Sequence, residues 1–449
     1  MAGDPVKLSA DGKDVLDINM AIVGGEGAFI AYHHDTGINL ANQASERNDR
    51  GDGVRPFRFN VVASALHEDG STSKAAGQKR GIQRPYESYT DLIAGEAKLP
   101  ADQRAAAVSI RLPNKFQHDA VMAFLKAGYH VVVDKPNAIR PSQASEQADL
   151  ASSKGLISAV TYTYSGAAMM REMRQRVMDG GLENITSIHG TYPQGWIIGL
   201  DKDLNFRMQY DVAGGFGVSA DLGVTHTLTD MEFATGLKIE EITANLFNIP
   251  NHPDPKKASE VDNYGQALLL MGDGNGFQRP ATAWWAQVSK AYGNDHSVAV
   301  DMLNASYKWT NSVIPGPGSE ALMKLDDAGY LAIPRDPNTP GRLTSKAALR
   351  ACKGPEAHSE GIDHWFKAIY YDAGAQMAGA IYGVGVPEAA KGILTLDNGA
   401  RSLWFLYKLA ESHAKGGVPV NAKFDKSAIP KLEAFVQKEY LDKIAPQRQ

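Results

Sequence analysis

The sequence predicts an α/β protein of two domains: a doubly wound parallel sheet at the N-terminus, then an α+β domain with a large, open, mostly antiparallel sheet. Short apolar runs alternate with helical stretches over the first 138 residues, which is the order of a parallel sheet with helical crossovers. Later β-rich runs follow one another across short Gly, Pro and Asn turns, as antiparallel strands do. The 449 residues exceed what one core usually holds, so a second domain is expected.

The first apolar run, residues 18–23, passes directly into a glycine-rich turn and then a helical stretch. The turn reads Gly24-Gly25-Glu26-Gly27-Ala28-Phe29. Strand, turn and helix in this order are typical of a dinucleotide site, because glycines let the backbone approach a pyrophosphate and the helix N-terminus offers free N–H groups. No single register fits all three glycines of G-x-G-x-x-G, so the pattern alone is a weak indication.

A second strand is predicted over residues 57–66, after a polar insertion at 42–56 that we expect to be a surface loop. An NAD site usually places an acidic residue at the end of this strand, against the ribose. Three polar residues stand there: His67, Glu68 and Asp69. Three basic residues of the kind that meets a 2′-phosphate lie downstream: Lys74, Lys79 and Arg80. The cofactor therefore stays open between NAD and NADP, with NAD preferred.

Two further strands complete the first domain, and the second of them ends in a lysine. Residues 105–112 form a strand that ends at Pro113-Asn114, and a helix over 117–127 leads to the apolar run 129–133. Asp134-Lys135-Pro136 follows, and Pro136 stops the strand by removing a backbone donor. An isolated Asp-Lys-Pro would indicate a surface loop, but the serial βαβ context places Lys135 at the carboxyl edge of the sheet, where ligands bind.

After residue 138 the pattern changes from alternating units to consecutive strands. We expect an N-terminal extension at 1–17, the nucleotide-binding domain at 18–138 and the second domain at 139–449, with its last helices packing back on the first domain. The predicted helices are 141–154, 167–179, 362–380 and 392–415. The predicted strands are 157–164, 185–192, 239–246, 263–271, 281–288 and 298–303, and loops are expected at 315–318 and 336–340.

These motifs together resemble the Gfo/Idh/MocA family of glucose–fructose oxidoreductase and inositol dehydrogenase-like enzymes, over nearly the whole chain. Asp134-Lys135-Pro136 matches the family's Glu-Lys-Pro, and Pro113-Asn114 matches a Pro-Asn after the preceding strand. A tyrosine-containing strand end at 161–164 and a glycine-rich stretch at 213–226 match as well. The family's Asp-x-Gly-x-His is altered here, because Asp221 precedes His226 by five residues rather than four. His226 is therefore the more secure match.

The resemblance implies NAD(P)-dependent oxidation of a secondary hydroxyl on a sugar, glycoside or cyclic polyol. His226 is the candidate base, since histidine titrates closest to the working pH. Lys135 is the candidate that stabilises the developing alkoxide, and Asp221 would orient His226 or bind a substrate hydroxyl. The alternative to a catalytic role is a polar histidine that is satisfied near a helix N-terminus, and this is the ordinary case for a histidine chosen at random.

The same resemblance implies two sets of binding residues. The cofactor set is Gly24, Gly25, Glu26, Gly27, Ala28, Phe29, His67, Pro113, Asn114, His118, Asp134 and Lys135. The substrate set is Tyr164, Gln194, Trp196, Trp285, Asn294 and His358, which are aromatic and amide side chains suited to a carbohydrate but also common in cores. Family members associate through the open sheet, so a homo-oligomer, dimer or tetramer, is implied.

Two other functions stay open. An NAD-dependent glycoside hydrolase that retains its cofactor would oxidise, eliminate, hydrate and reduce again with the same Lys135 and His226, and it would form no net NADH. A binding or regulatory protein could instead keep the nucleotide pocket without redox activity. The degenerate glycine turn favours that last alternative, and the presence of both Lys135 and His226 weighs against it.

The composition of the chain argues against several classes of partner. The formal net charge is −5 and no basic run occurs, which argues against nucleic acid. Cys352 is the one cysteine, so neither a disulfide framework nor a thiol-rich metal site is expected, and no metal is predicted. No apolar run is long enough to span a bilayer, and the first residues lack a charged segment followed by an apolar one. A cytoplasmic enzyme with no membrane partner is expected.

Overall fold

The computed structural model describes residues 8, 14–47, 53–312, 319–326, 329–333, 348 and 361–445, which fall into two compact units. The first unit comprises Met1–Ala138, Gln143–Thr161 and Ile362–Gly399, and the second comprises Ile139–Ser142, Tyr162–Gly361 and Ala400–Gln449. The sequence placed a single boundary after residue 138, whereas the chain enters each unit more than once. The expected loops at 315–318 and 336–340, together with Cys352 and His358, lie outside the described residues.

The first unit is built on a six-stranded sheet in the order β3-β2-β1-β4-β5-β6, in which all neighbouring strands are parallel. Its strands are β1 (Leu16–Val23), β2 (Phe57–Ala65), β3 (Arg84–Pro85), β4 (Ala107–Ile110), β5 (His130–Val133) and β6 (Ser158–Val160). The strand order reverses between β1 and β4, which is the switch point where such sheets bind ligands. The predicted doubly wound parallel sheet is confirmed.

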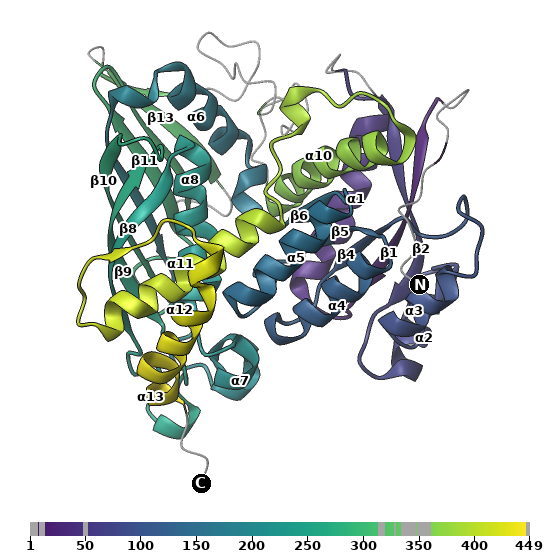
Figure 1. Ribbon diagram of the computed structural model, residues 1–449, viewed down its shortest axis with the longest axis horizontal. Coiled ribbons are helices and arrows are strands. Elements are labelled where there is room, and N and C mark those ends of the chain that lie inside the picture. The colour runs from purple at the N-terminus through teal and green to yellow at the C-terminus, as the bar shows by residue number, and fades with distance from the viewer. Residues whose placement is uncertain are drawn as a thin grey trace. The chain divides into compact units, whose positions relative to one another are not determined.

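The helices of this unit connect its strands and cover the sheet. They are α1 (Phe29–Arg47), α2 (Gly70–Lys79), α3 (Tyr89–Glu96), α4 (Asn114–Lys126), α5 (Pro141–Ser153) and α10 (Ile362–Tyr382). The late helix α10 packs against α1 and against β1 and β2 (Figure 1). The shared core contains Phe57 from β2 together with Phe366 and Tyr370 from α10.

The expected surface loop at 42–56 is wrong in its first part, because α1 continues to Arg47. The polar residues that indicated a loop pin this helix to β2. The Asn42 side chain donates to the Phe59 carbonyl at 2.9 Å and accepts from its amide at 2.8 Å. The Ser45 hydroxyl accepts from the Phe57 amide at 2.7 Å. Buried polar side chains satisfied in this way are indistinguishable from loop residues in the sequence.

The second unit contains a nine-stranded sheet in the order β14-β13-β12-β11-β7-β10-β9-β8-β15. Its strands are β7 (Ile185–Pro193), β8 (Lys238–Phe247), β9 (Tyr264–Gly272), β10 (Gln278–Ala286), β11 (His296–Met302), β12 (Ser306–Ser312), β13 (Ser319–Asp326), β14 (Gly329–Ala332) and β15 (Val420–Asn421). The β7–β10 pair is parallel and the other pairs are antiparallel, so the predicted mostly antiparallel sheet is confirmed.

The helices of the second unit include α6 (Ala168–Asp179), α8 (Thr229–Thr235), α11 (Leu396–Ala414) and α12 (Ile429–Val436). Of these, α6 and α8 pack on the sheet (Figure 1). The strand expected over 157–164 ends at Val160, and Tyr164 lies instead on a 3₁₀ turn, η1 (Thr163–Gly166). Within the described part of the chain, no helix is both long and apolar enough to cross a membrane.

Candidate functional site

The glycine-rich turn after β1 has the backbone that a pyrophosphate site needs. Gly24, Gly25 and Gly27 have φ angles of 74°, 85° and 72°, in the region that L side chains rarely adopt. A Cβ on Gly24 would lie 2.8 Å from the Arg111 carbonyl oxygen, whereas a Cβ on Gly27 would meet nothing within 4 Å. The turn is thus packed on one side and open beside Gly27, where α1 begins with free N–H groups. These residues fit an NAD pyrophosphate despite the irregular spacing.

The three polar residues after β2, His67, Glu68 and Asp69, differ in their hydrogen bonds. Asp69 caps α2 by accepting from the Thr72 amide at 2.8 Å, and hydrogen bonds from Thr72 lower the pKa of Asp69 to about 2. His67 accepts the Asp69 amide on Nδ1 at 2.9 Å, and Glu68 is exposed. Asp69 is therefore held as a helix cap, and His67 and Glu68 are the exposed polar groups at this strand end.

Two of the basic residues considered for a 2′-phosphate already form ion pairs. Arg80 donates to Asp35 at 2.5 Å, and Lys74 lies 3.1 Å from Glu87. Asp35 also accepts from the buried Arg111 at 2.6 Å, beneath the glycine turn.

Lys135 follows β5 and is half-buried, and its peptide bond to Pro136 is cis. Its neighbour Asp134 accepts from the Thr161 hydroxyl at 2.9 Å and lies 3.8 Å from Nε2 of the buried His34. Burial acts to raise the pKa of Asp134, but His34 and Thr161 outweigh it and hold that pKa below its usual value. The carboxylate next to Lys135 therefore stays ionised.

Helix α4 supports the same segment. It begins at Asn114 after Pro113, with no side-chain cap on its first amides. Gln117 donates to the carbonyl oxygens of Asp134 at 2.8 Å and of Pro136 at 3.1 Å, which ties the helix to the Lys135 segment. His118 lies one residue further along α4, and burial lowers its pKa.

In the second unit, Asp221 and His226 lie on a π-helix, η5 (Ser219–Leu228). Its wider turn brings residues five apart onto one side, as an α-helix does for residues four apart. Three threonine hydroxyls bond to the carbonyl five residues earlier: Thr225 to Ala220 at 2.9 Å, Thr227 to Leu222 at 3.0 Å and Thr229 to Val224 at 2.6 Å. The extra residue in the motif is thus absorbed by the helix, and Asp221 and His226 share one side of it.

Polar partners hold the Asp221 carboxylate in place. Arg207 donates to one carboxylate oxygen at 3.2 Å and Gln287 donates to the other at 2.8 Å. Arg207 lies in a short 3₁₀ turn, η4 (Phe206–Met208), with no motif, which is why the sequence did not single it out. A carboxylate with one donor on each oxygen is a rigidly held acceptor on the same helix as His226.

His226 is 4% exposed and is enclosed by aromatic rings. The ring centroids of Tyr164 and Tyr192 lie 5.1 Å and 5.6 Å from that of His226. The two tyrosine hydroxyls are 2.5 Å apart. Burial raises the pKa of Tyr164 to about 12, although hydrogen bonds with Tyr192 and Asn294 oppose part of the rise. Both phenols stay neutral and can donate hydrogen bonds.

A chain of amides leads from this enclosure to an exposed indole. Gln194 donates to Asn294 at 2.5 Å, and the Trp196 indole donates to Gln194 at 2.7 Å. Trp196 is 42% exposed although its ring is fixed by that bond. The structure therefore brings together four residues of the predicted substrate set, Tyr164, Gln194, Trp196 and Asn294, in the unit that contains His226.

Trp285 lies apart from these four residues, so the predicted substrate set is corrected at this position. It is fully buried, and its indole donates to the Ser219 hydroxyl at 3.0 Å. A Cβ on Gly223 would lie 2.7 Å from its ring, so the indole packs directly under η5. Alternation along β10 puts Trp285 on the helix side and Trp284 on the open side of the sheet.

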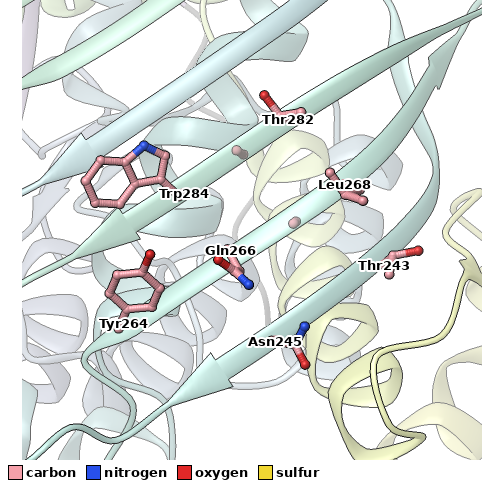
Figure 2. A pocket seen from close by; sticks show the side chains of 9 residues that line it. Thr243, Asn245, Tyr264, Gln266, Leu268, Thr282 and Trp284 are labelled. Carbon is pink, nitrogen blue, oxygen red and sulfur yellow. The ribbon is translucent and has the colours of Figure 1, made fainter.

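The open side of the sheet has a shallow depression of about 470 Å³. Side chains of β8, β9 and β10 form it, and Figure 2 shows Thr243, Tyr264, Gln266 and Trp284 standing on these strands. Because Trp284 faces it and Trp285 faces η5, the depression lies on the opposite side of the sheet from the His226 helix. Among the described residues, no cluster of His, Cys, Asp and Glu could hold a metal ion.

Residues 18–162 match the family model described as "Oxidoreductase family, NAD-binding Rossmann fold" (GFO_IDH_MocA). Over this region the chain is similar to that family of NAD-binding oxidoreductases. The resemblance inferred from the motifs is confirmed.

Individual proteins are also similar to this chain, in sequence or in structure. An uncharacterized oxidoreductase of Bacillus subtilis, YfiI, is 27% identical over 64% of this chain and 69% of its own length. Levoglucosan dehydrogenase of Pseudarthrobacter phenanthrenivorans is 26% identical over 32% of this chain and 37% of its own length. An inositol dehydrogenase homolog of Azotobacter vinelandii, solved with NADH and myo-inositol, has a TM-score of 0.73 and 21% identity over 93% of this chain and 100% of that one. The last comparison shows a shared fold.

Proposed function

We propose that this protein is an NAD-dependent dehydrogenase that oxidises a secondary hydroxyl of a sugar, glycoside or cyclic polyol to a ketone. The main support is the surroundings of His226, which is enclosed by two neutral phenols next to a series of hydrogen-bonded amides. The other unit of the protein matches an NAD-binding oxidoreductase domain. Carbohydrate sites combine such aromatic faces with side-chain donors and acceptors. Relatives named for levoglucosan and myo-inositol support this substrate class.

The acid–base chemistry is assigned to Lys135, His226 and Asp221. The turn at residues 24–29 and the N-terminus of α1 would hold NAD, which would supply the hydride acceptor. His226 takes the proton of the substrate hydroxyl, and the Lys135 ammonium stabilises the negative charge that develops on that oxygen. Asp221, fixed by Arg207 and Gln287, accepts a hydrogen bond from a neighbouring hydroxyl or orients His226.

The Tyr164–Trp196 chain defines how the substrate ring is held in this proposal. The phenol of Tyr164 and the amides of Gln194 and Asn294 offer donors and acceptors to ring hydroxyls, and the fixed Trp196 indole offers an exposed apolar face. An indole held before binding loses little conformational freedom when a sugar stacks on it.

The deciding experiment follows the reduced-nicotinamide absorbance of the purified protein with a panel of polyols, sugars and aryl glycosides, first without cofactor and then with NAD or NADP. Continued growth of the band that requires added NAD supports the dehydrogenase. Aglycone release without lasting NADH would instead identify the retained-cofactor glycoside hydrolase. Nucleotide binding with no turnover on any substrate would favour the binding protein.

We further propose that the protein forms a homo-oligomer through the open side of the nine-stranded sheet. Leu268 is 62% exposed and lines the depression between Thr243 of β8 and Thr282 of β10, and the half-exposed Tyr264 and Trp284 stand further along β9 and β10 (Figure 2). Apolar side chains gathered on an uncovered sheet are typical of an interface.

A further inference from the structure

Asp230 and His296 are buried side by side without hydrogen-bond partners. Both are fully buried, and Oδ2 of Asp230 lies 3.6 Å from Nε2 of His296, which is longer than a hydrogen bond. Among the residues that the structure describes, neither carboxyl oxygen and neither ring nitrogen has a hydrogen-bond partner. Leaving such groups unsatisfied costs on the order of 1–3 kcal/mol each, so their presence calls for a role.

The pair adjoins the proposed base. Asp230 follows His226 by four residues, at the start of α8 directly after η5, and residues at this spacing are neighbours on a helix. His296 stacks on Tyr192 with ring centroids 4.4 Å apart, and Tyr164 lies at 4.5 Å. The same two tyrosines contact His226, so both histidines share one aromatic enclosure.

We infer that Asp230 and His296 are a proton-exchange pair that supplies a counter-charge to His226 when His226 takes the substrate proton; this inference rests on the proposed function. The Asp230 O–H bond breaks and its electron pair stays on the carboxylate, while the Nε2 lone pair of His296 forms the new N–H bond. No proton is gained or lost by the pair. The carboxylate then lies between two imidazolium rings, which is favourable in a medium of low dielectric.

The resting charges agree with this direction of transfer. Burial raises the pKa of Asp230 well above its usual value and lowers the pKa of His296 to about 3, so the acid keeps its proton and the imidazole is neutral until a charge appears nearby. Three neutral phenols face the pair: Tyr162 and Tyr164 toward Asp230, and Tyr192 stacked on His296. On the other side of His296, the Trp309 ring lies 5.1 Å away and its indole donates to the buried Glu320. The charged residues on α6 and α11 bond to groups other than this pair. On α6, Arg171 donates to the Ser165 carbonyl, Arg174 donates to the Phe233 carbonyl, and Glu172 accepts from Arg176. On α11, Arg401 donates to Glu232.

Asp230 and His296 are thus positioning residues that act through His226, and the titration of His226 tests them without turnover. In the unliganded full chain, with histidine rings isotopically labelled, the NMR titration midpoint of His226 should fall by about one pH unit or more in Asp230→Asn. His296→Phe, which keeps an aromatic ring in the stack, should lower it in the same direction. Thr235→Val, which removes a buried hydroxyl from the same helix, is the control and should leave the midpoint unchanged.

Kinetics provide the second readout. If the protein oxidises polyols, Asp230→Asn should lower kcat by about tenfold or more with little change in KM, and the acidic limb of its pH profile should move with the His226 midpoint. A His226 midpoint that is the same in wild type and in both variants overturns the inference, whatever the activity. Absence of dehydrogenase turnover in the wild type refutes the proposed function alone, because the titration still decides the role of the pair.

Discussion

Lys135 and His226 are the two residues on which the proposed chemistry depends, and each tolerates few replacements. Lys135 is half-buried directly after β5, next to the Asp134 carboxylate. His226 is 4% exposed and is enclosed by the rings of Tyr164 and Tyr192. Changes at these positions should therefore affect turnover more than binding or folding.

Replacing Lys135 with alanine should lower kcat about 100-fold or more while nucleotide affinity stays nearly intact, because the charge acts on the developing alkoxide. Stopped-flow turnover and fluorescence titration with NADH measure the two quantities separately. Lys98→Ala, an exposed lysine of the same unit, is the matched control. Turnover that survives in Lys135→Ala would remove this lysine from the mechanism.

Asp221→Asn tests the shifted motif. The substitution keeps the shape but removes the charge that faces Arg207, and it places an NH₂ where one of two donors now bonds. We expect kcat/KM to fall about tenfold or more, against little change in Asp301→Asn on the open side of the sheet. A loss no larger than that of the control would mean that this carboxylate serves the fold and not the reaction.

At the scale of elements, the π-helix η5 explains how an altered motif keeps its geometry. A π-helical turn is an α-helical turn with one residue added, and removal of that residue restores the α-helix without rotating the helix beyond it. Deleting Val224 from η5 should therefore leave a folded protein with measurable turnover. Deleting Met231 from α8 should unfold it, because every residue of that α-helix is buried and the rest of it would rotate away from its packing partners. Circular dichroism melts compare the two, and equal loss of folding would contradict the explanation.

The sequence predicted most regular elements for physical reasons that vary along the chain. Strands β4 and β5 and the second half of β1 are buried on both sides, and a glycine or proline follows each within three residues, which leaves little ambiguity. Strand β12 was missed because its alternating pattern contains polar Ser, Thr and Asn residues at both ends. Helix η5 was beyond prediction, since its π character depends on threonine hydroxyls that read as ordinary helix residues.

In the candidate site, too, some residues could be predicted from the sequence and others could not. Glycines, Lys135 and His226 could be found because motifs fix their positions relative to strand ends. Trp285 was misassigned because Trp284 and Trp285 are adjacent in sequence and only the strand register decides which one faces the core. Arg207 and the Asp230–His296 pair have no local signal, because tertiary packing alone brings their partners together.

At the scale of the whole molecule, association through the open sheet should depend on Leu268. A charge there would be buried in the interface, where an unpaired ammonium is costly. Leu268→Lys should shift the protein toward the monomer in light scattering after size exclusion. Leu303→Lys, on a loop residue that is 75% exposed and outside the depression, should leave the assembly as it is. An assembly unaffected by Leu268→Lys would locate the interface elsewhere.

The stability of the molecule should also depend on pH through His130, the buried first residue of β5. His130 is 1% exposed, its Nδ1 accepts the Ile157 amide at 3.0 Å, and burial lowers its pKa from 6.5 to about 4. Between these two values the unfolded chain binds a proton on this residue and the folded chain does not, so stability falls as the pH falls. Relative to His130→Gln, the wild type should lose about 1.4 kcal/mol of unfolding free energy per pH unit between pH 6.5 and 4, and nothing above pH 6.5. Urea unfolding of both proteins across this range measures the difference, and parallel curves would show that His130 takes up a proton in the folded state.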